Sequence, residues 1–176
     1  MSYKHLPKNI IIIGNIASGK TSLLDLITKD PRMKKVRIYR ESETTLPIIT
    51  NVIYPAIKNK DAEAIYLGQK SVLEIFTKMM LEANNSEDVD VNIWERSPID
   101  TTLVFTRDHK NTGRITETRY TDYMNQFEHT MTTLIPLLDT IWYLRVSPET
   151  AYKRTKNRLK RGGGLTEEKE IGLGSW

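Results

Sequence analysis

Short apolar runs alternate with longer amphipathic stretches along this chain, and the alternation predicts a parallel α/β fold. The apolar runs are rich in β-branched residues, which is typical of strands that are buried on both faces. Helical patterns lie between them, so we expect one parallel sheet with helices on both faces. The four predicted strands are residues 10–13, 36–40, 89–94 and 140–145.

The predicted helices fill the segments between these strands. The longest is amphipathic, because Ile65, Val72 and Phe76 recur at a helical spacing along one face. Ser147 and Pro148 suit the N-cap and the first turn of the last helix. A polar loop is expected at 108–113. The predicted helices are residues 21–29, the later part of 46–57, 62–84, 98–107, 119–134 and 147 to about 161.

A glycine-rich motif follows the first predicted strand and opens the first predicted helix. It reads Gly14-Asn15-Ile16-Ala17-Ser18-Gly19-Lys20-Thr21 and fits G-x-x-x-x-G-K-[ST] in the context that this motif requires. Its glycines allow close backbone approach, so that loop amides and the helix N-terminus converge on an anion. Lys20 can reach the terminal phosphates and the Thr21 hydroxyl can bind Mg²⁺. The motif predicts binding of a nucleoside triphosphate such as ATP, but does not say where the γ-phosphate goes.

Composition favours an ordinary soluble protein. The 176 residues, of which 39% are hydrophobic and 27% charged, predict a single domain over 1–176. No run has the length of a membrane span, and the N-terminus lacks a signal-peptide apolar region. The absence of cysteine excludes disulfides, thiolate catalysis and cysteine-based zinc sites. We therefore expect an intracellular, cytoplasmic protein with no membrane partner.

Charged residues follow the predicted strands at the edge where open α/β sheets bind ligands. Glu41 comes after the second strand, and Glu95-Arg96-Ser97 come after the third. Beside a triphosphate, Glu41 is a candidate base for an attacking hydroxyl. The simpler alternatives are a surface carboxylate at Glu41 and an exposed ion pair of little energetic worth at Glu95 and Arg96.

Basic residues are concentrated between 153 and 161, where six of nine residues are Lys or Arg. Arg154, Arg158 and Arg161 share one helical face, so this helix could close over the phosphates and neutralise charge. The default interpretation is a solvated helix face, and a nucleic-acid patch is a further alternative. No aromatic residue lies within the run, and the net charge of +4 is mild, so we expect no nucleic-acid partner.

The long predicted helix carries Gln69, Val72 and Phe76 on one stripe. One amide with two apolar side chains is most often a core face with a polar edge. The same stripe could form the wall of a nucleobase pocket, and spacing alone does not separate the two.

Taken in order, these residues resemble the deoxynucleoside kinase family, which includes deoxycytidine and deoxyguanosine kinases and the mitochondrial and herpesviral thymidine kinases. The matches run from about residue 9 to 161, through the glycine-rich motif, Glu41, Gln69, Glu95-Arg96-Ser97 and a segment at 143–152 that leads into the basic helix. The resemblance implies a P-loop three-layer α/β/α fold with a basic lid at about 153–164.

The resemblance also implies roles for matching positions. Glu41 would be the general base at the 5′-hydroxyl, Arg96 would hold that hydroxyl and the incoming phosphoryl group, and Glu95 would assist Mg²⁺. Gln69 would pair with the base, with Val72 beside it. Further implied contacts are Tyr54 at the sugar 3′-hydroxyl, Phe105 stacked on the base, and Arg154, Arg158 and Lys160 in the lid.

Substrate preference is indicated by two positions. Deoxycytidine-type members recognise the base with an Arg and an Asp, and the corresponding positions here are Phe76 and Thr101. An apolar pocket with Gln69 suits a pyrimidine, so we expect thymidine or a broad pyrimidine range.

Three departures from the family pattern stand out. Ser42 and Leu46 occupy positions near the catalytic glutamate where many members have Pro and Trp. Glycines at 162–164 stand where the family has a glutamate for the 3′-hydroxyl. The sequence ends at Trp176, before a segment that would match the family's fifth strand, so we expect four strands.

The sequence therefore predicts an enzyme that phosphorylates a deoxynucleoside at its 5′-hydroxyl with ATP and Mg²⁺, with Lys20, Arg96 and the lid holding the developing charge. Three alternatives remain: a nucleoside monophosphate kinase of the thymidylate type, a catalytically impaired nucleotide-binding protein, and a basic nucleic-acid adaptor. The resemblance allows a homodimer.

Overall fold

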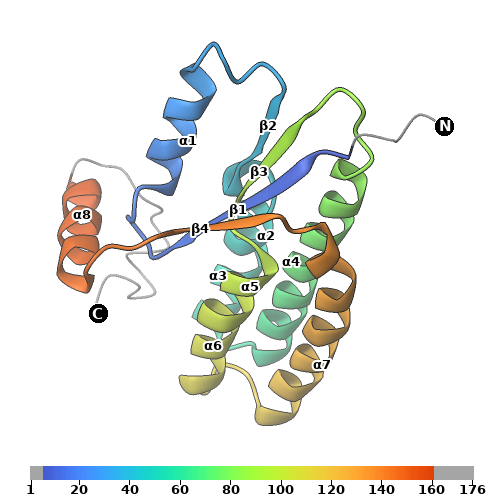
Figure 1. Ribbon diagram of the computed structural model, residues 1–176. Helices are drawn as coiled ribbons and strands as arrows, with labels where there is room; N and C mark the ends of the chain where they lie inside the picture. Colours follow the sequence, from blue (N-terminus) through green and yellow to red (C-terminus); the bar gives the residue numbers. More distant parts are fainter. Residues whose placement is uncertain (1–5, 161–176) are drawn as a thin grey trace.

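A computed structural model of the chain describes residues 6–160 (Figure 1). The predicted lid residues beyond 160, including Arg161 and the glycines at 162–164, lie outside this range. The strands are β1 (Lys8–Gly14), β2 (Val36–Tyr39), β3 (Val91–Glu95) and β4 (Thr140–Leu144). The α-helices are α1 (Lys20–Lys29), α2 (Leu46–Ile48), α3 (Tyr54–Asn59), α4 (Ala62–Ala83), α5 (Pro98–Asp100), α6 (Arg107–Asn111), α7 (Glu117–Leu134) and α8 (Pro148–Lys160). Two 3₁₀ turns, η1 (Glu41–Glu43) and η4 (Ile135–Leu137), and two π-helical segments, η2 (Ile49–Ile53) and η3 (Thr101–Thr106), complete them.

The four strands form one parallel sheet in the order β2-β3-β1-β4. The predicted parallel α/β fold is confirmed, with β1 at the centre between β3 and β4. Each of the four predicted strands is present, with its ends shifted by two residues or fewer. Because all strands run the same way, their carboxyl ends meet at one edge of the sheet.

Helices cover both faces of the sheet, as Figure 1 shows. The pattern follows from the alternation of side chains along β1, since neighbouring residues of a strand point to opposite faces. Ile12 packs with Leu24 of α1 on one face. Ile11 packs with Met80 of α4 and Leu134 of α7 on the other. The result is the three-layer arrangement that the sequence predicts.

A buried polar side chain, Asn9, joins the strands near their amino ends. Its Oδ1 accepts hydrogen bonds from Asn92 Nδ2 at 3.2 Å and from Trp94 Nε1 at 3.1 Å. Its Nδ2 donates to the carbonyl of Leu137 at 3.0 Å, and its backbone N–H donates to Asp139 Oδ2 at 2.8 Å. Asn9 therefore fixes β1 against β3 and the segment before β4, and so helps to set the strand ends at the other edge.

The structure confirms the predicted N-cap at Ser147 and corrects the predictions for two other segments. The Ser147 Oγ accepts a hydrogen bond from the N–H of Thr150, as the predicted N-cap of α8 requires. The segment at 46–59 is helical throughout, not only in its later part. The loop predicted at 108–113 is wrong over its first four residues, because α6 continues to Asn111. A polar segment predicts a loop only when its side chains face solvent, and His109 is buried.

Within residues 6–160, no helix combines the length and apolarity needed to cross a bilayer.

Candidate functional site

A cavity of about 390 Å³ opens beyond the carboxyl ends of the strands. Its volume is in the range of small-molecule sites. One wall is apolar and comes from the helical segments at 46–59, and residues of α4 and η3 also line the cavity. Both π-helical segments border the cavity, which is common because π-helical turns are frequent at functional sites. The apolar wall consists of Leu46, Ile49, Ile53 and Ile57.

The glycine-rich motif forms a tight loop between β1 and α1 beside this cavity. A Cβ at Gly14 would lie 2.7 Å from the carbonyl oxygen of Leu144, so only glycine fits there. Gly19 has a φ of 103°, which side chains rarely adopt. The Lys20 ammonium folds back over the loop, where its Nζ donates to the carbonyls of Gly14 at 2.9 Å and Asn15 at 3.0 Å.

The environment of Lys20 lowers the pKa of its ammonium to about 8. Burial is the main cause, and the nearby Arg96 guanidinium adds to it, while Glu41, Asp100 and Glu95 oppose it in part. Because the ammonium is partly desolvated, a polyanion that binds beside it would stabilise its charged form.

Thr21 and Glu95 meet at the mouth of the loop. The Thr21 hydroxyl donates to Glu95 Oε1 at 2.6 Å, and the backbone N–H of Glu41 donates to Glu95 Oε2 at 3.3 Å. These oxygens are the type of ligand that Mg²⁺ prefers, usually together with water and substrate phosphates. Among the described residues, no group of three or more Asp, Glu or His side chains could hold a metal alone. The pair therefore fits an ion that is shared with a bound triphosphate.

Arg96 lies between two carboxylates. Its Nε donates to Glu41 Oε1 at 3.1 Å, and its Nη1 is 3.4 Å from Asp100 Oδ2. The guanidinium also lies 4.9 Å from the ring centre of Phe105. Burial alone would lower the pKa of Arg96, but the charges of Glu41 and Asp100 raise it. The arginine stays charged and is held in a defined place.

Asp100 is a site residue that sequence reasoning missed. It is buried, and its Oδ1 accepts from the Ser97 backbone N–H at 2.7 Å and from the Ser97 Oγ at 3.2 Å. The Ser97 Oγ in turn accepts from the N–H groups of Ile99 and Asp100. The spacing Ser-Pro-x-Asp is a capping-box pattern, with Asp in place of the usual Glu or Gln, and could have identified this residue.

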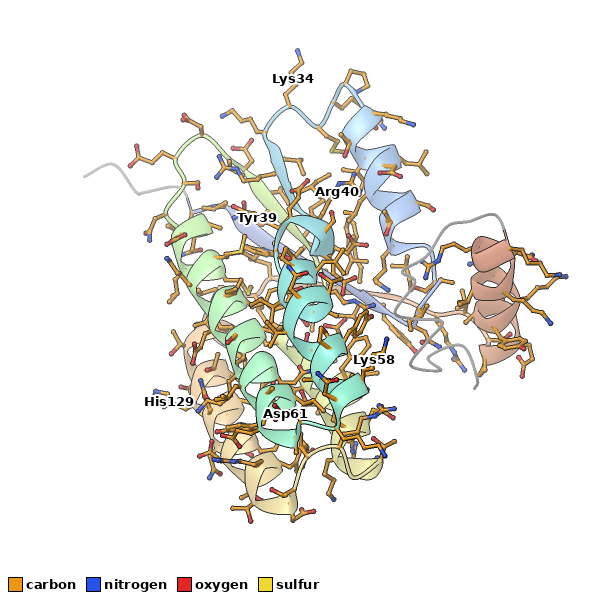
Figure 2. The ribbon with its side chains drawn as sticks, turned by 180° about the vertical axis from the view of Figure 1, so that it is seen from behind. Lys34, Tyr39, Arg40, Lys58, Asp61 and His129 are labelled. Atoms are coloured by element: carbon orange, nitrogen blue, oxygen red, sulfur yellow. The ribbon has the colours of Figure 1, made fainter. Side chains whose placement is uncertain are left out.

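The basic helix α8 reaches the loop and the cavity. Arg154 Nη1 donates to the carbonyl of Ala17 at 3.2 Å, and Arg158 lines the cavity. Lys160 is the last residue of α8. Arg40, which directly follows β2 (Figure 2), also lines the cavity. Its Nη2 lies 2.8 Å from Asp25 Oδ1. Cations from two elements thus border the site.

Most of the predicted base-pocket residues line the cavity, but Phe76 is an exception. Phe76 is 1% exposed and belongs to a core cluster with Ile53 and Val72. The stripe of 69, 72 and 76 runs from the cavity into the core, because isoleucines from 48–57 cover that part of α4. Phe76 supports the wall from behind. The predicted pocket residues that do line the cavity are Tyr54, Gln69, Val72, Thr101 and Phe105.

A polar group at one end of the cavity was also missed. Asp108, His109 and Arg114 line it, and Arg114 Nη1 lies 2.9 Å from Asp108 Oδ2. Burial, together with the charge of Arg114, lowers the pKa of His109 to about 4. The helical spacing of four from Phe105 to His109 was the one signal that could have placed this histidine on the cavity side.

Comparison with known proteins adds to this geometry. The model of the deoxynucleoside kinase family matches residues 10–173. The chain is 27% identical over 168 residues to mitochondrial thymidine kinase 2 of Homo sapiens, covering 94% of this chain and 59% of that protein. It is 29% identical over 154 residues to a probable deoxycytidine kinase of fowlpox virus (strain NVSL), covering 87% of this chain and 62% of that one. The chain thus spans about three-fifths of the length of these relatives.

A solved structure is similar in fold. Deoxyadenosine kinase from M. mycoides, determined with the products dCMP and a flexible dCDP, superimposes with a TM-score of 0.64 at 24% sequence identity. The match covers 91% of this chain and 73% of that one.

Proposed function

Because the chain belongs to the deoxynucleoside kinase family, we propose that it transfers the γ-phosphoryl group of a nucleoside triphosphate to the 5′-hydroxyl of a deoxynucleoside. The observation that carries the proposal is the pair of Glu41 and Arg96, whose Oε1 and Nε atoms lie 3.1 Å apart in the cavity beside the phosphate loop. A carboxylate held next to a cation can accept a proton from a hydroxyl while the cation holds the reacting oxygens.

The reaction follows from these positions. Glu41 takes the proton of the 5′-hydroxyl as its oxygen forms a bond to the γ-phosphorus. The bond between that phosphorus and the β–γ bridging oxygen breaks, and the nucleoside diphosphate leaves with the electron pair. Lys20 on the donor side and Arg96 on the acceptor side stabilise the negative charge that spreads over the phosphoryl oxygens.

The donor half of the site is the loop of residues 14–21 together with α8. We propose ATP as the donor, held by the loop amides, Lys20 and the arginines at 154 and 158, with Lys160 at the end of the same helix. Thr21 and Glu95 would hold Mg²⁺, which neutralises charge on the donor phosphates when it is bound.

The charge balance of the cavity favours a hydroxyl over a phosphate as acceptor. Three of the cavity arginines already pair with carboxylates: Arg96 with Glu41 and Asp100, Arg40 with Asp25, and Arg114 with Asp108. An acceptor monophosphate would need cations whose charge is not already compensated. The balance therefore supports a neutral nucleoside over the monophosphate that a thymidylate-type kinase would bind.

We propose a pyrimidine deoxynucleoside as the acceptor, with thymidine as the leading candidate. Support comes from the apolar wall at 46–57, the Gln69 amide on α4 and the Phe105 ring, which together suit a flat base with few polar groups. Tyr54 lines the same cavity, and we propose that it contacts the sugar.

A phosphate-transfer assay tests the proposal. The protein is incubated with Mg²⁺, γ-³²P-labelled ATP and each of the four deoxynucleosides, and in parallel with thymidine monophosphate. We expect labelled 5′-monophosphates from at least the pyrimidine nucleosides, and loss of the product in Glu41→Gln. Transfer to thymidine monophosphate alone would instead establish a monophosphate kinase. Thermal stabilisation by ATP without any transfer would establish a nucleotide-binding protein.

A further inference from the structure

We propose that Asp108, His109 and Arg114 form a base-recognition group that selects a deoxynucleoside whose base carries a carbonyl oxygen at ring position 4. This inference rests on the proposed function, because it names what the acceptor half of the same cavity selects.

The group lies beyond Phe105 when the cavity is followed away from the catalytic pair. Phe105 contacts Arg96, and His109 is one helical turn further along, on α6. The chain then folds back, since the backbone N–H of Arg114 donates to the carbonyl of His109 at 2.8 Å. In Figure 1, α6 lies further from the sheet than α5 does. A nucleoside with its 5′-hydroxyl at Glu41 would point its base toward this end.

Arg114 brings hydrogen-bond donors to the cavity. A guanidinium carries five N–H donors and no acceptor, and Arg114 donates from Nη1 to Asp108 Oδ2 at 2.9 Å. The carboxylate of Asp108 neutralises the charge of Arg114 and holds its orientation. About a quarter of each of the two side chains is exposed, so they are open to the cavity.

His109 carries a nitrogen that lacks a partner. The side chain is 6% exposed, and within residues 6–160 its Nδ1 is buried with no hydrogen-bond partner. The imidazole is neutral at physiological pH, since burial lowers its pKa to about 4. A neutral imidazole offers one donor and one acceptor. An unpaired nitrogen of this kind is costly unless a bound molecule satisfies it, and His109 lines the cavity where that molecule would lie.

The chemistry of the group decides which base it accepts. Its strongest acceptor, the Asp108 carboxylate, already binds Arg114, so the group as a whole presents donors. The base edge of thymine or uracil has a carbonyl oxygen at position 4, whereas cytosine has an amino group there, which is itself a donor. An amino group facing Arg114 would leave donors unpaired on both sides, and sites that hydrogen-bond their substrate reject such analogues strongly.

Deoxyuridine and deoxycytidine test this directly, since they have the same sugar and bases of the same shape. We expect the unaltered protein to prefer deoxyuridine by roughly tenfold or more in kcat/KM. The double variant Asp108→Asn with Arg114→Met removes both partners of the ion pair and should bring the ratio close to one. The matched control is Glu63→Gln with Arg119→Met, which removes an exposed pair at 2.8 Å between α4 and α7 and should keep the ratio.

Separate variants examine the histidine. His109→Phe should reduce the preference, mainly through a higher KM for deoxyuridine, whereas His109→Gln keeps a donor and an acceptor and should retain most of it. His129→Phe is the control, because His129 is exposed on α7 and projects outward (Figure 2).

The outcomes separate this inference from the proposed function. A merely structural role would lower kcat/KM for both nucleosides equally and leave the ratio unchanged, which would overturn the inference, as would a preference for deoxycytidine in the unaltered protein. Should the double variant fail to fold, the variants His109→Phe and His109→Gln still test the inference, together with the ratio of kcat/KM for deoxyuridine to that for deoxycytidine in the unaltered protein. If neither nucleoside is phosphorylated, the proposed function itself fails.

Discussion

Triphosphate binding should take up a proton at Lys20. The free protein holds this ammonium in a buried loop at a pKa of about 8. A bound triphosphate places several negative charges beside it and should raise its pKa, so that the ammonium stays charged from pH 7 to pH 9. From the pKa of about 8, uptake should be roughly 0.1 proton per triphosphate at pH 7, about 0.5 at pH 8 and about 0.9 at pH 9. Linkage then raises the Kd for the triphosphate by about tenfold between pH 7 and pH 9.

The sign of the effect on the free protein is fixed by the same shift. Because the pKa of Lys20 is lower in the folded chain than its ordinary 10.5, the unfolded chain binds more protons between those values. The free energy of unfolding should therefore rise with pH from about 8 toward 10.5 as far as Lys20 contributes. Below that range, the charged Lys20 ammonium lowers the free energy of unfolding because it is buried, and a bound triphosphate should offset this cost.

Calorimetric titration measures the proton directly. A non-hydrolysable triphosphate with Mg²⁺ is titrated at pH 8 in buffers of different ionisation enthalpy, and the slope of heat against that enthalpy gives the protons taken up. The triphosphate itself contributes little, since a phosphate loses its last proton near pH 6. Lys20→Arg keeps its charge at pH 8 and should show no uptake, whereas Lys29→Arg, on the exposed side of α1, should behave as the unaltered protein does. Uptake below about 0.1 at pH 8 in the unaltered protein, or equal uptake in Lys20→Arg, would refute the reasoning.

Three further outcomes are expected. Asp100→Asn should lower kcat by roughly tenfold to a hundredfold with little change in KM, because Arg96 loses the second of its two carboxylate partners. The control is Asp61→Asn, at the N-cap of α4 (Figure 2), which should leave kcat unchanged. Asn9→Leu should lower the free energy of unfolding by roughly 2–4 kcal/mol in urea titrations, since it leaves buried polar partners on β3 and η4 without a hydrogen bond, whereas the exposed Asn125→Ala should change it by less than about 0.5 kcal/mol. The folded pKa of about 4 at His109 lies below its ordinary 6.5, so stability should fall by roughly 3 kcal/mol as pH drops from 6.5 through 4, and His109→Phe should flatten this dependence; an unchanged slope would contradict it.

The sheet could be predicted from the sequence because its strands are local patterns. The β-branched run that contains Ile11 and Ile12 is apolar on both sides, which only a strand covered on both faces needs. The phosphate loop could also be predicted from the sequence, since the close backbone approach at residue 14 requires a glycine. Glu41 and Arg96 could be placed together because both directly follow parallel strands.

The side of the cavity away from the phosphate loop could not be predicted from local sequence patterns. Phe76 shares a helical stripe with Gln69, but whether that stripe faces a cavity or the core depends on how the segment at 46–59 packs over α4. The helix at 107–111 has a polar sequence, so the burial of His109 is a tertiary effect that local composition does not encode. The capping-box spacing points to Asp100 as a helix-cap residue, but its contact with Arg96, which has a left-handed φ of 78°, is a tertiary feature that the spacing does not show.

The most direct test of the account is the turnover of Glu41→Gln with the preferred deoxynucleoside, measured beside its affinity for the triphosphate. The account predicts that kcat falls by roughly a hundredfold to ten-thousandfold, because the hydroxyl loses its base. The Kd for a non-hydrolysable triphosphate with Mg²⁺ should stay within about twofold, since Glu41 belongs to the acceptor side. A Glu41→Gln protein that retains a tenth or more of the original kcat would contradict the assignment of this carboxylate and, with it, the proposed mechanism.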